Sequence, residues 1–246
     1  MSTQRKVALV TGSATGVGRA CALRFARLGY AVAVNYSKSE AEARETAAAV
    51  ETMGVPVLLH KATIGDDMQV RAMVARVGAE LGGLDVLVNN AATTHFIQHS
   101  DLDALTDAVW DEIFQVNLKG TFYCCRAALP LLKERQGNIV TVSSVAGLSG
   151  QGSSIPYCAS KGAVNTLTQS LARVAGPDVR VNAVAPGPIL TRWLEGREAQ
   201  IEKYLEQAAI KRAASPEDIA DAVLYLATGT TLTTGQVIVV DGGRTM

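Results

Sequence analysis

Short apolar runs alternate with longer stretches of helical periodicity along the whole chain. The runs typical of buried strands are residues 7–11, 31–35, 56–60, 84–88, 137–143, 179–185 and 236–240. The stretches typical of helices are residues 17–28, 39–53, 66–81, 104–134, 155–175 and 216–228. This alternation favours an α/β fold with a doubly wound, parallel seven-stranded sheet and helices on both faces.

Glycine and polar motifs stand where predicted strands end. Gly12, Asn89, Ser144 and Pro186 each end or follow one of these strands. The carboxyl ends of parallel strands share one edge of a sheet, and ligands bind there near the point where the winding reverses. The chain shows no linker, repeat or low-complexity segment, so we expect residues 1–246 to form one domain with one site at this edge.

The first predicted strand runs directly into a glycine turn. Gly12, Gly16 and Gly18 lie between the apolar run that ends at Thr11 and a helical stretch that reaches Leu28. Glycines permit a tight turn and close backbone approach, and the helix N-terminus offers unpaired N–H groups. A strand, a glycine turn and a helix in this order predict a site for a dinucleotide pyrophosphate.

Tyr157 and Lys161 stand four residues apart in a predicted helix, and Ser144 precedes the tyrosine by thirteen residues. One helical turn places the phenol and the ammonium on the same face. A neighbouring cation favours the phenolate and lowers the pKa of a tyrosine toward the range useful for acid–base catalysis. The alternative is a surface tyrosine and lysine that are helical neighbours by chance.

Composition excludes several classes of function. The 246 residues are 48% hydrophobic and 19% charged, with 23 basic and 23 acidic side chains, which gives no support for a nucleic-acid or acidic-membrane partner. No apolar run is long enough to span a bilayer, and no secretory signal is visible. We expect a cytoplasmic protein with reduced cysteines at positions 21, 124, 125 and 158.

Two histidines have a spacing that can bind a metal. His95 and His99 are four residues apart, but no third ligand stands at a sensible spacing. We therefore predict no metal site, and place both histidines near the substrate entrance or on the surface.

The complete set of motifs resembles the short-chain dehydrogenase/reductase family. The set comprises T-G-x-x-x-G-x-G at 11–18, N-N-A at 89–91, Asn117, Ser144, Y-x-x-x-K at 157–161 and P-G at 186–187. These motifs occur in the order and at the spacings of the family and cover essentially the whole chain. The resemblance implies a Rossmann fold, with residues 192–212 as a substrate-lid insertion; ordinary packing of that segment on the sheet is compatible with the same role.

The resemblance also implies the catalytic roles. Ser144 would polarise a substrate carbonyl, with Ser143 as the competing candidate. Tyr157 would exchange a proton with the substrate oxygen, while Lys161 lowers the pKa of the tyrosine and binds the nicotinamide ribose. Asn117 would hold a water that relays protons; a buried asparagine satisfied by the backbone is the alternative.

The cofactor site implied by the resemblance draws on every motif. We expect it to include Gly12, Ser13, Thr15, Gly16, Val17, Gly18, Asn35, Tyr36, Ser37, Lys38, Thr63, Ile64, Asn89, Ala91, Tyr157, Lys161, Pro186, Gly187, Ile189 and Thr191. Two positions depart from the family pattern. Ala92 replaces a usual glycine, and Thr63 stands where the family often has an aspartate that contacts adenine.

The choice between NADP and NAD depends on the end of the second strand. NAD sites usually carry an acid there that binds the ribose 2′-hydroxyl, but the first acid in this chain is Glu40. Ser37 and Lys38 could bind a 2′-phosphate, and Arg19 could also approach it. We predict NADP as the cofactor, with NAD possible if Lys38 is only a solvated charge.

The implied activity is hydride transfer between a nicotinamide and a carbonyl or secondary alcohol. The sequence does not separate a 3-oxoacyl-thioester reductase from a sugar, polyol or other alcohol dehydrogenase. A cofactor-sensing binding protein would typically lose the tyrosine or lysine, and the glycine spacing disfavours an epimerase or dehydratase.

We expect a small-molecule substrate and a homo-oligomer, either a tetramer or a dimer. The resemblance implies contact between copies through the long fourth and fifth helices. Helix 155–175 carries an apolar stripe that could serve this contact or cover its own sheet. An acidic acyl carrier could meet Arg126, Lys133 and Arg173, although the balanced net charge does not favour it.

Overall fold

The computed structural model describes residues 4–246. Its centre is a seven-stranded, entirely parallel sheet in the order β3-β2-β1-β4-β5-β6-β7. The strands are β1 Val7–Val10, β2 Ala31–Tyr36, β3 Val57–Lys61, β4 Val86–Asn89, β5 Asn138–Val142, β6 Arg180–Pro186 and β7 Val237–Val240. The order reverses between β1 and β4, so this sheet is doubly wound and the predicted fold class is confirmed.

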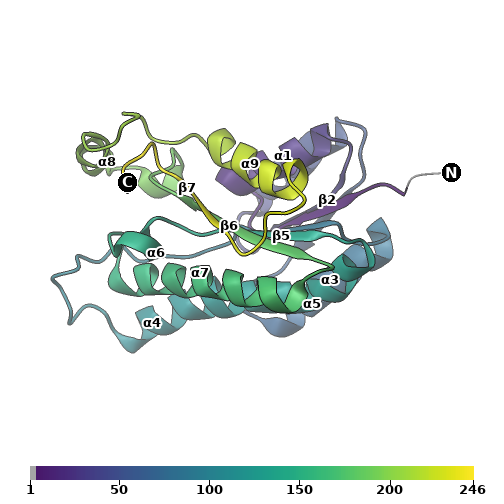
Figure 1. Ribbon diagram of the computed structural model, residues 1–246, viewed down its shortest axis with the longest axis horizontal. Coiled ribbons are helices and arrows are strands. Elements are labelled where there is room, and N and C mark those ends of the chain that lie inside the picture. Colours follow the sequence, from purple (N-terminus) through teal and green to yellow (C-terminus); the bar gives the residue numbers. More distant parts are fainter. Residues whose placement is uncertain (1–3) are drawn as a thin grey trace.

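Helices cover both faces of the sheet (Figure 1). They are α1 Gly16–Arg27, α2 Glu40–Glu51, α3 Asp67–Leu81, α4 Asp107–Phe114, η1 Gln115–Gly120, α5 Thr121–Glu134, α6 Ala146–Ser149, α7 Ile155–Ala175, η2 Arg192–Leu194, α8 Glu198–Leu205, α9 Pro216–Leu224 and η3 Tyr225–Gly229. Among the described residues, none of these helices is both long and apolar enough to cross a membrane.

Alternate residues of each strand enter opposite cores. In β1, Ala8 and Val10 pack with α1, α2 and α9, whereas Val7 and Leu9 pack with α3, α5 and α7. All four side chains are fully buried. Because both faces are covered, each strand reads as a continuous apolar run, which is why the sequence predicts the strands well.

The predicted helix 104–134 is wrong in two respects. The helix begins at Asp107, and a π-helical turn, η1, separates α4 from α5. Thr106 is the N-cap residue of α4 and has extended backbone angles. The π turn contains Asn117, one of the predicted site residues, and turns of this kind often occur at functional sites. Hydrophobic periodicity does not reveal one extra residue in a turn.

The segment from Ile189 to Ala214 follows β6, and its two ends meet. Ile189 and Ala214 form a parallel bridge, and the Leu190 N–H donates to the Ala214 carbonyl at 2.9 Å. The helices η2 and α8 lie between these points. We call the whole segment of residues 189–214 the excursion 189–214. Its two ends are therefore fixed side by side.

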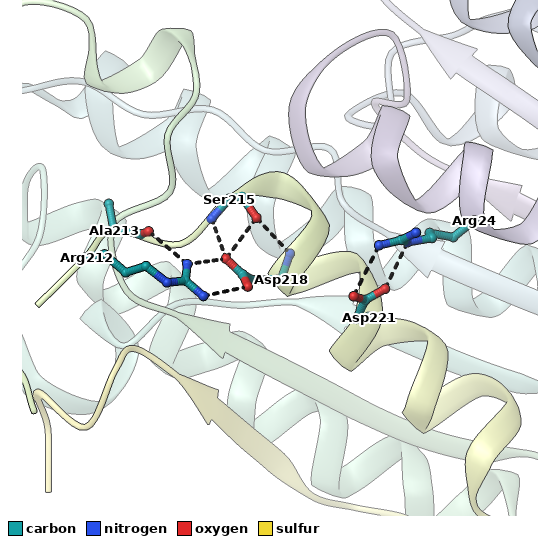
Figure 2. A network of polar contacts seen from close by, with 6 residues as sticks. All are labelled: Arg24, Arg212, Ala213, Ser215, Asp218 and Asp221. Atoms are coloured by element: carbon teal, nitrogen blue, oxygen red, sulfur yellow. Dashed lines mark hydrogen bonds and ion pairs between the residues drawn. The ribbon is translucent and has the colours of Figure 1, made fainter. Parts of the chain in front are cut away.

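The excursion ends at a well-capped helix, α9 (Figure 2). Ser215 and Asp218 form a capping box, in which the Ser215 side chain accepts from the Asp218 N–H and Asp218 accepts from the Ser215 N–H. Arg212 donates two hydrogen bonds to the Asp218 carboxylate, at 2.6 and 2.9 Å. One turn along, Arg24 pairs with Asp221 and joins α1 to α9.

Candidate active site

A cavity of about 980 Å³ opens at the carboxyl ends of the strands. This volume suits a sizeable ligand. Most of the predicted site residues line it: Gly12, Thr15, Gly16, Val17, Asn35, Tyr36, Ser37, Lys38, Thr63, Ile64, Ala91, Ser144, Tyr157, Lys161, Pro186, Gly187, Ile189 and Thr191. Ser13, Gly18, Asn89 and Asn117 are not among the lining residues.

The glycine turn has the conformation that its sequence predicts. Gly12 and Gly16 have φ angles of +61° and +55°, which disfavour any residue with a side chain. A Cβ on Gly12 would lie 2.9 Å from the Cα of Ala91. The side chain of Thr15, the N-cap of α1, makes no capping bond. The start of α1 is therefore suited to an anion such as a pyrophosphate.

Three of the four predicted residues outside the cavity support it from beneath. The Ser13 hydroxyl donates to the Val10 carbonyl, and a Cβ on Gly18 would collide with the Gly12 carbonyl. Asn89 is buried, and its amide nitrogen lies 3.2 Å from the Cys125 sulfur. These three residues hold the turn and the sheet edge in place. Their contact with the cofactor stays a prediction.

Asn35 lines the cavity, but its side chain is engaged by the protein. Its Oδ1 accepts from the Gly12 N–H at 3.1 Å, and its Nδ2 donates to the Ala62 carbonyl at 3.0 Å. The side chain is thus a brace between the glycine turn and the end of β3. Its position at a strand end gave the correct region but did not indicate this bracing role.

Ser144, Tyr157 and Lys161 meet at the floor of the cavity. The Tyr157 hydroxyl lies close enough to Ser144 for that side chain to lower the pKa of the phenol. The Lys161 ammonium lies 5.7 Å from the centre of the Tyr157 ring and donates to the Val142 carbonyl at 2.9 Å. Strand β5 presents the serine, and α7 presents the other two one turn apart, as their spacing predicts.

The expected lowering of the Tyr157 pKa by Lys161 is wrong for this structure. Burial raises the pKa of Tyr157 to about 12, against the lowering effect of the hydrogen bond with Ser144. Burial also lowers the pKa of Lys161 to about 8. The tyrosine and the lysine are both poorly solvated, so burial disfavours the charged form of each.

Ser143 and Ser144 have different environments. The Ser143 hydroxyl donates to the Asn165 side chain at 2.6 Å and is buried. The Ser144 hydroxyl accepts from the Ala146 N–H at 3.1 Å and faces Tyr157. Of the two candidates, Ser144 is the one that faces the tyrosine, and Ser143 fixes α7 against β5.

Asn117 lies in the π turn and is satisfied by protein groups. Its Oδ1 accepts from the Thr93 N–H at 2.8 Å, and its Nδ2 donates to the Thr93 carbonyl and to the Ser160 hydroxyl. The side chain therefore ties the loop after β4 to α7, near Tyr157. This matches the alternative of a buried, satisfied asparagine; the water relay stays a prediction.

The two histidines point to different partners. His95 Nε2 lies 2.8 Å from the Glu112 carboxylate, and His99 Nε2 donates to the Gly152 carbonyl at 3.2 Å. Within residues 4–246, no group of three or more histidine, cysteine, aspartate or glutamate side chains has the arrangement of a metal site.

The far end of the cavity would receive the adenosine. Ser37 and Lys38 line it and are exposed, whereas Tyr36 is buried. Thr63 is also exposed, and its N–H donates to the Gln69 side chain at 3.0 Å. Arg19, which the sequence suggested as a second phosphate ligand, is not among the described residues that line the cavity.

The excursion 189–214 and the loop after β4 form the opposite, apolar end. Phe96, Ile97, Trp193, Leu194 and Ile201 line it. The Arg197 guanidinium stacks 3.5 Å from the centre of the Phe96 ring. Burial raises the pKa of Tyr204, which also lines this end, to about 12, and its hydroxyl has no hydrogen-bond partner within the described residues.

Comparison with known proteins agrees with this geometry. A family model described as "Enoyl-(Acyl carrier protein) reductase" matches residues 12–245. The chain is 44% identical over 241 residues to the protein named as ketoacyl reductase 2 of the granaticin polyketide synthase from Streptomyces violaceoruber, covering 96% of this chain and 95% of that protein.

A 3-oxoacyl-[acyl-carrier-protein] reductase from Staphylococcus aureus strain Mu50 is 39% identical over 245 residues, with 98% of each chain covered. The crystal structure of a short-chain dehydrogenase from Burkholderia cenocepacia J2315 in complex with NADP has a TM-score of 0.92 and 33% identity over 99% of both chains. This chain belongs to the short-chain dehydrogenase/reductase family.

As a short-chain dehydrogenase/reductase, the protein is an NAD(P)-dependent oxidoreductase that transfers a hydride between nicotinamide and a carbonyl or secondary alcohol. The residues present fit the cofactor, because a glycine turn with positive φ angles leads into an uncapped helix start beside a long cavity.

Sequence reasoning missed several supporting residues of this short-chain dehydrogenase/reductase. Asn90 donates to the carbonyls of Thr11 and Gly12, and the Thr11 hydroxyl accepts from the N–H groups of Asn90 and Ala91. The N-N-A motif therefore clamps the glycine turn through its second residue. The doubled asparagine was the available signal, but only the sheet order shows that β1 and β4 are neighbours.

Proposed function

We propose that this short-chain dehydrogenase/reductase uses NADP(H) to reduce 3-oxoacyl thioesters to 3-hydroxyacyl thioesters. The observation that carries the chemistry is the meeting of Ser144 and Tyr157 in the cavity lining with the buried Lys161, whose ammonium lies 5.7 Å from the centre of the tyrosine ring. The relatives named as a ketoacyl reductase and as a 3-oxoacyl-[acyl-carrier-protein] reductase support the substrate class. The apolar end of the cavity supports a substrate with an acyl chain.

The catalytic residues have separate roles in this proposal. The bound cofactor supplies a hydride to the C3 carbonyl carbon in reduction. The Ser144 hydroxyl hydrogen bonds to the carbonyl oxygen, and this bond strengthens as negative charge develops there. Tyr157 gives its phenolic proton to the same oxygen, so that the carbonyl becomes an alcohol. Lys161, as an ammonium, stabilises the phenolate that remains.

The raised pKa of Tyr157 keeps the phenol protonated at neutral pH, as proton donation requires. A pKa of about 12 means that the tyrosine holds its proton until the substrate oxygen gains charge. The phenolate anion then offsets the free-energy cost of burying the Lys161 ammonium, because the two opposite charges lie side by side. The oxidation of an alcohol would need the opposite starting state, with the phenolate formed first.

The cofactor preference rests on the adenosine end of the cavity. Lys38 offers a cation there, Ser37 offers a hydroxyl, and the lining carries no acid between Tyr36 and Ser39. The crystal structure from Burkholderia cenocepacia, a similar protein, was solved in complex with NADP. Both observations support NADP(H) over NAD(H).

A homo-oligomer is part of the proposal. On α5 and α7, the side chains of Phe122 and Val174 are 37% and 66% exposed in the isolated chain. A tetramer or dimer that covers these helices accounts for that apolar exposure.

All four cysteines are free and buried, which supports the reducing environment of the cytoplasm.

A substrate panel tests the proposed function. The purified protein is mixed with a 3-oxoacyl thioester, a 2-enoyl thioester, a simple ketone or a polyol, each with NADPH or NADH, and the absorbance of the reduced cofactor is followed. We expect the highest kcat/KM for the 3-oxoacyl thioester with NADPH. Preference for the polyol or the enoyl thioester would contradict the substrate class, and turnover with none of them would favour a cofactor-sensing protein.

A further inference from the structure

Arg192 crosses the cavity from the excursion 189–214 to the turn between β2 and α2. Its Nη2 donates to the Ser39 hydroxyl at 3.1 Å, and its Nη1 lies 3.7 Å from the Glu42 carboxylate. The residues it reaches are more than 140 positions away in the sequence. Arg192 and Ser39 both line the cavity, whereas Glu42 does not.

The neighbouring residue fixes where this crossing occurs. A Cβ on Gly16 would lie 3.2 Å from the Thr191 methyl group, so Thr191 stands directly over the glycine turn. Arg192 continues from there toward Ser37, Lys38 and Ser39. It therefore lies above the stretch between the predicted pyrophosphate site and the predicted ribose of the adenosine.

The basic side chains of the cavity divide between its ends. Among the described residues, the lysines and arginines of the lining are Lys38, Lys161, Arg192 and Arg197. Lys161 is buried and donates to Val142, and Arg197 stacks on Phe96 at the apolar end. The glycine turn itself, from Gly12 to Gly18, carries no basic residue. Lys38 and Arg192 thus supply the positive charge at the adenosine end.

Ser39 is turned toward this charge. It is the N-cap residue of α2, yet its side chain makes no capping hydrogen bond and accepts from Arg192 instead. A serine at an N-cap usually accepts from a backbone N–H of the first turn. The hydroxyl and the start of α2 are consequently available to an anion placed between Lys38 and Arg192.

We propose that Arg192 is a second cationic ligand of the cofactor 2′-phosphate, delivered by the excursion, and that Glu42 competes for it. This inference rests on the proposed use of NADP(H). Arginine binds phosphate through two parallel hydrogen bonds, and the planar guanidinium can exchange the carboxylate for the phosphate with a small rotation. NADPH then contacts both the excursion and the turn after β2. Its charged 2′-phosphate, which NADH lacks, makes it the favoured cofactor.

The competing explanation is a purely structural ion pair. If Arg192 and Glu42 only hold the excursion to α2, removing either charge breaks the same contact, and both variants change cofactor binding in the same direction. If Arg192 binds the phosphate, the two variants act in opposite directions, because loss of Glu42 frees the arginine and removes a repelling charge. The sign of the Glu42 effect therefore separates the two explanations.

The experiment measures dissociation constants for NADPH and NADH by titrating the cofactor's fluorescence in the wild type and in Arg192→Gln and Glu42→Gln. We expect Arg192→Gln to weaken NADPH binding about 10-fold or more and to leave NADH binding within about twofold. Glu42→Gln should tighten NADPH binding about two- to fivefold without affecting NADH. Lys203→Gln, an exposed change on α8, is the matched control and should alter neither.

Each other outcome has a definite meaning. Equal weakening of both cofactors by Arg192→Gln, no effect of it, or weaker NADPH binding in Glu42→Gln would overturn the inference while leaving the NADP preference of the wild type intact. A wild type that binds NADH as tightly as NADPH would instead refute the proposed cofactor. Binding of adenosine 2′,5′-bisphosphate in the same titrations, by displacement of NADPH, should follow the NADPH pattern.

Discussion

The polar side chains at the two ends of the cavity have opposite environments, buried at one end and exposed at the other. At the catalytic end, Tyr157 and Lys161 belong to a long helix, and Lys161 is only 4% exposed. At the adenosine end, Lys38 lies in the bend after β2 and Arg192 begins the short helix η2; both are exposed, and the Arg192–Glu42 ion pair is 3.7 Å long. Burial at the first end disfavours the charged form of Tyr157 and of Lys161. At the second end, the charges of Lys38 and Arg192 stay solvated.

The difference determines which property each end can change easily. A buried group has a pKa set by desolvation, so its substitution alters chemistry and stability together. An exposed charge is screened by water and salt, so its substitution alters ligand choice with little effect on folding. In the proposed function, the acid–base groups therefore lie where solvent is largely excluded, and the groups that select the cofactor lie at the surface.

The largest expected effect comes from removing the phenol at the buried end. Tyr157→Phe should lower kcat by about 10³-fold or more, since it removes the proton donor and leaves the ring packing intact. Cofactor binding should stay within about twofold. Steady-state kinetics and a fluorescence titration of NADPH measure the two quantities.

Tyr225→Phe is the matched control for this substitution, because Tyr225 is 54% exposed on η3 and lies outside the cavity lining. It should leave kcat unchanged. Retained turnover in Tyr157→Phe would remove the tyrosine from the mechanism.

A second substitution tests whether the buried cation costs stability. Burial lowers the pKa of Lys161 from 10.5 to about 8, so the unfolded chain binds the proton more tightly than the folded one between these values. Lys161→Met should abolish turnover and, without cofactor at pH 7, raise the free energy of unfolding by about 2 kcal/mol, after the loss of the bond to Val142.

The pH dependence gives the sign of this effect. The penalty for burying Lys161 is complete below about pH 8 and disappears as the pH rises toward 10.5. Denaturant unfolding of both proteins across this range should therefore show the advantage of Lys161→Met shrinking. Lys61→Met, at an exposed strand end, serves as the control. A variant that is less stable at every pH would contradict the argument.

The smallest effect is expected at a third place, outside the cavity, where the excursion meets α9 and the charges are partly exposed as they are at the adenosine end. Arg212 and the Ser215 N–H hold the pKa of Asp218 well below its ordinary value. Asp218→Asn should lower the free energy of unfolding by about 1 kcal/mol near neutral pH. The contribution of Asp218 is present above about pH 4 and is lost as the pH falls below it, so the two proteins should converge in acid.

Glu217→Gln removes the same charge from the same helical turn without touching the capping box, and it should change stability by less than about 0.5 kcal/mol. If thermal unfolding shows equal effects for the two variants, general charge at the start of α9, and not the capping box, is the source of the stability.

The sequence predicted the sheet and the catalytic floor well because local rules govern both. Each strand is a continuous buried run, and the four-residue spacing in α7 is enough to bring Tyr157 and Lys161 together. The choice of Ser144 over Ser143 came from family spacing, and the structure turns Ser144 toward the tyrosine.

The sequence could not predict properties that depend on distant neighbours. The pKa of Tyr157 follows burial by the whole fold, and a helical neighbour does not determine it. Cofactor contact by Asn35 stays a prediction, and the sequence did not indicate that its amide joins Gly12 to Ala62. Arg192 carries no local signal at all, because Ser39 is 153 positions away from it.

The π turn that contains Asn117 depends on the exact number of residues between positions 115 and 120. A residue deleted there would convert the turn to a regular α-helix, and every residue on its N-terminal side would rotate by about 100° relative to α5. Asn117 would then swing away from Thr93 and Ser160, which it now links. We therefore expect this short stretch to tolerate the exchange of exposed side chains better than the gain or loss of a residue.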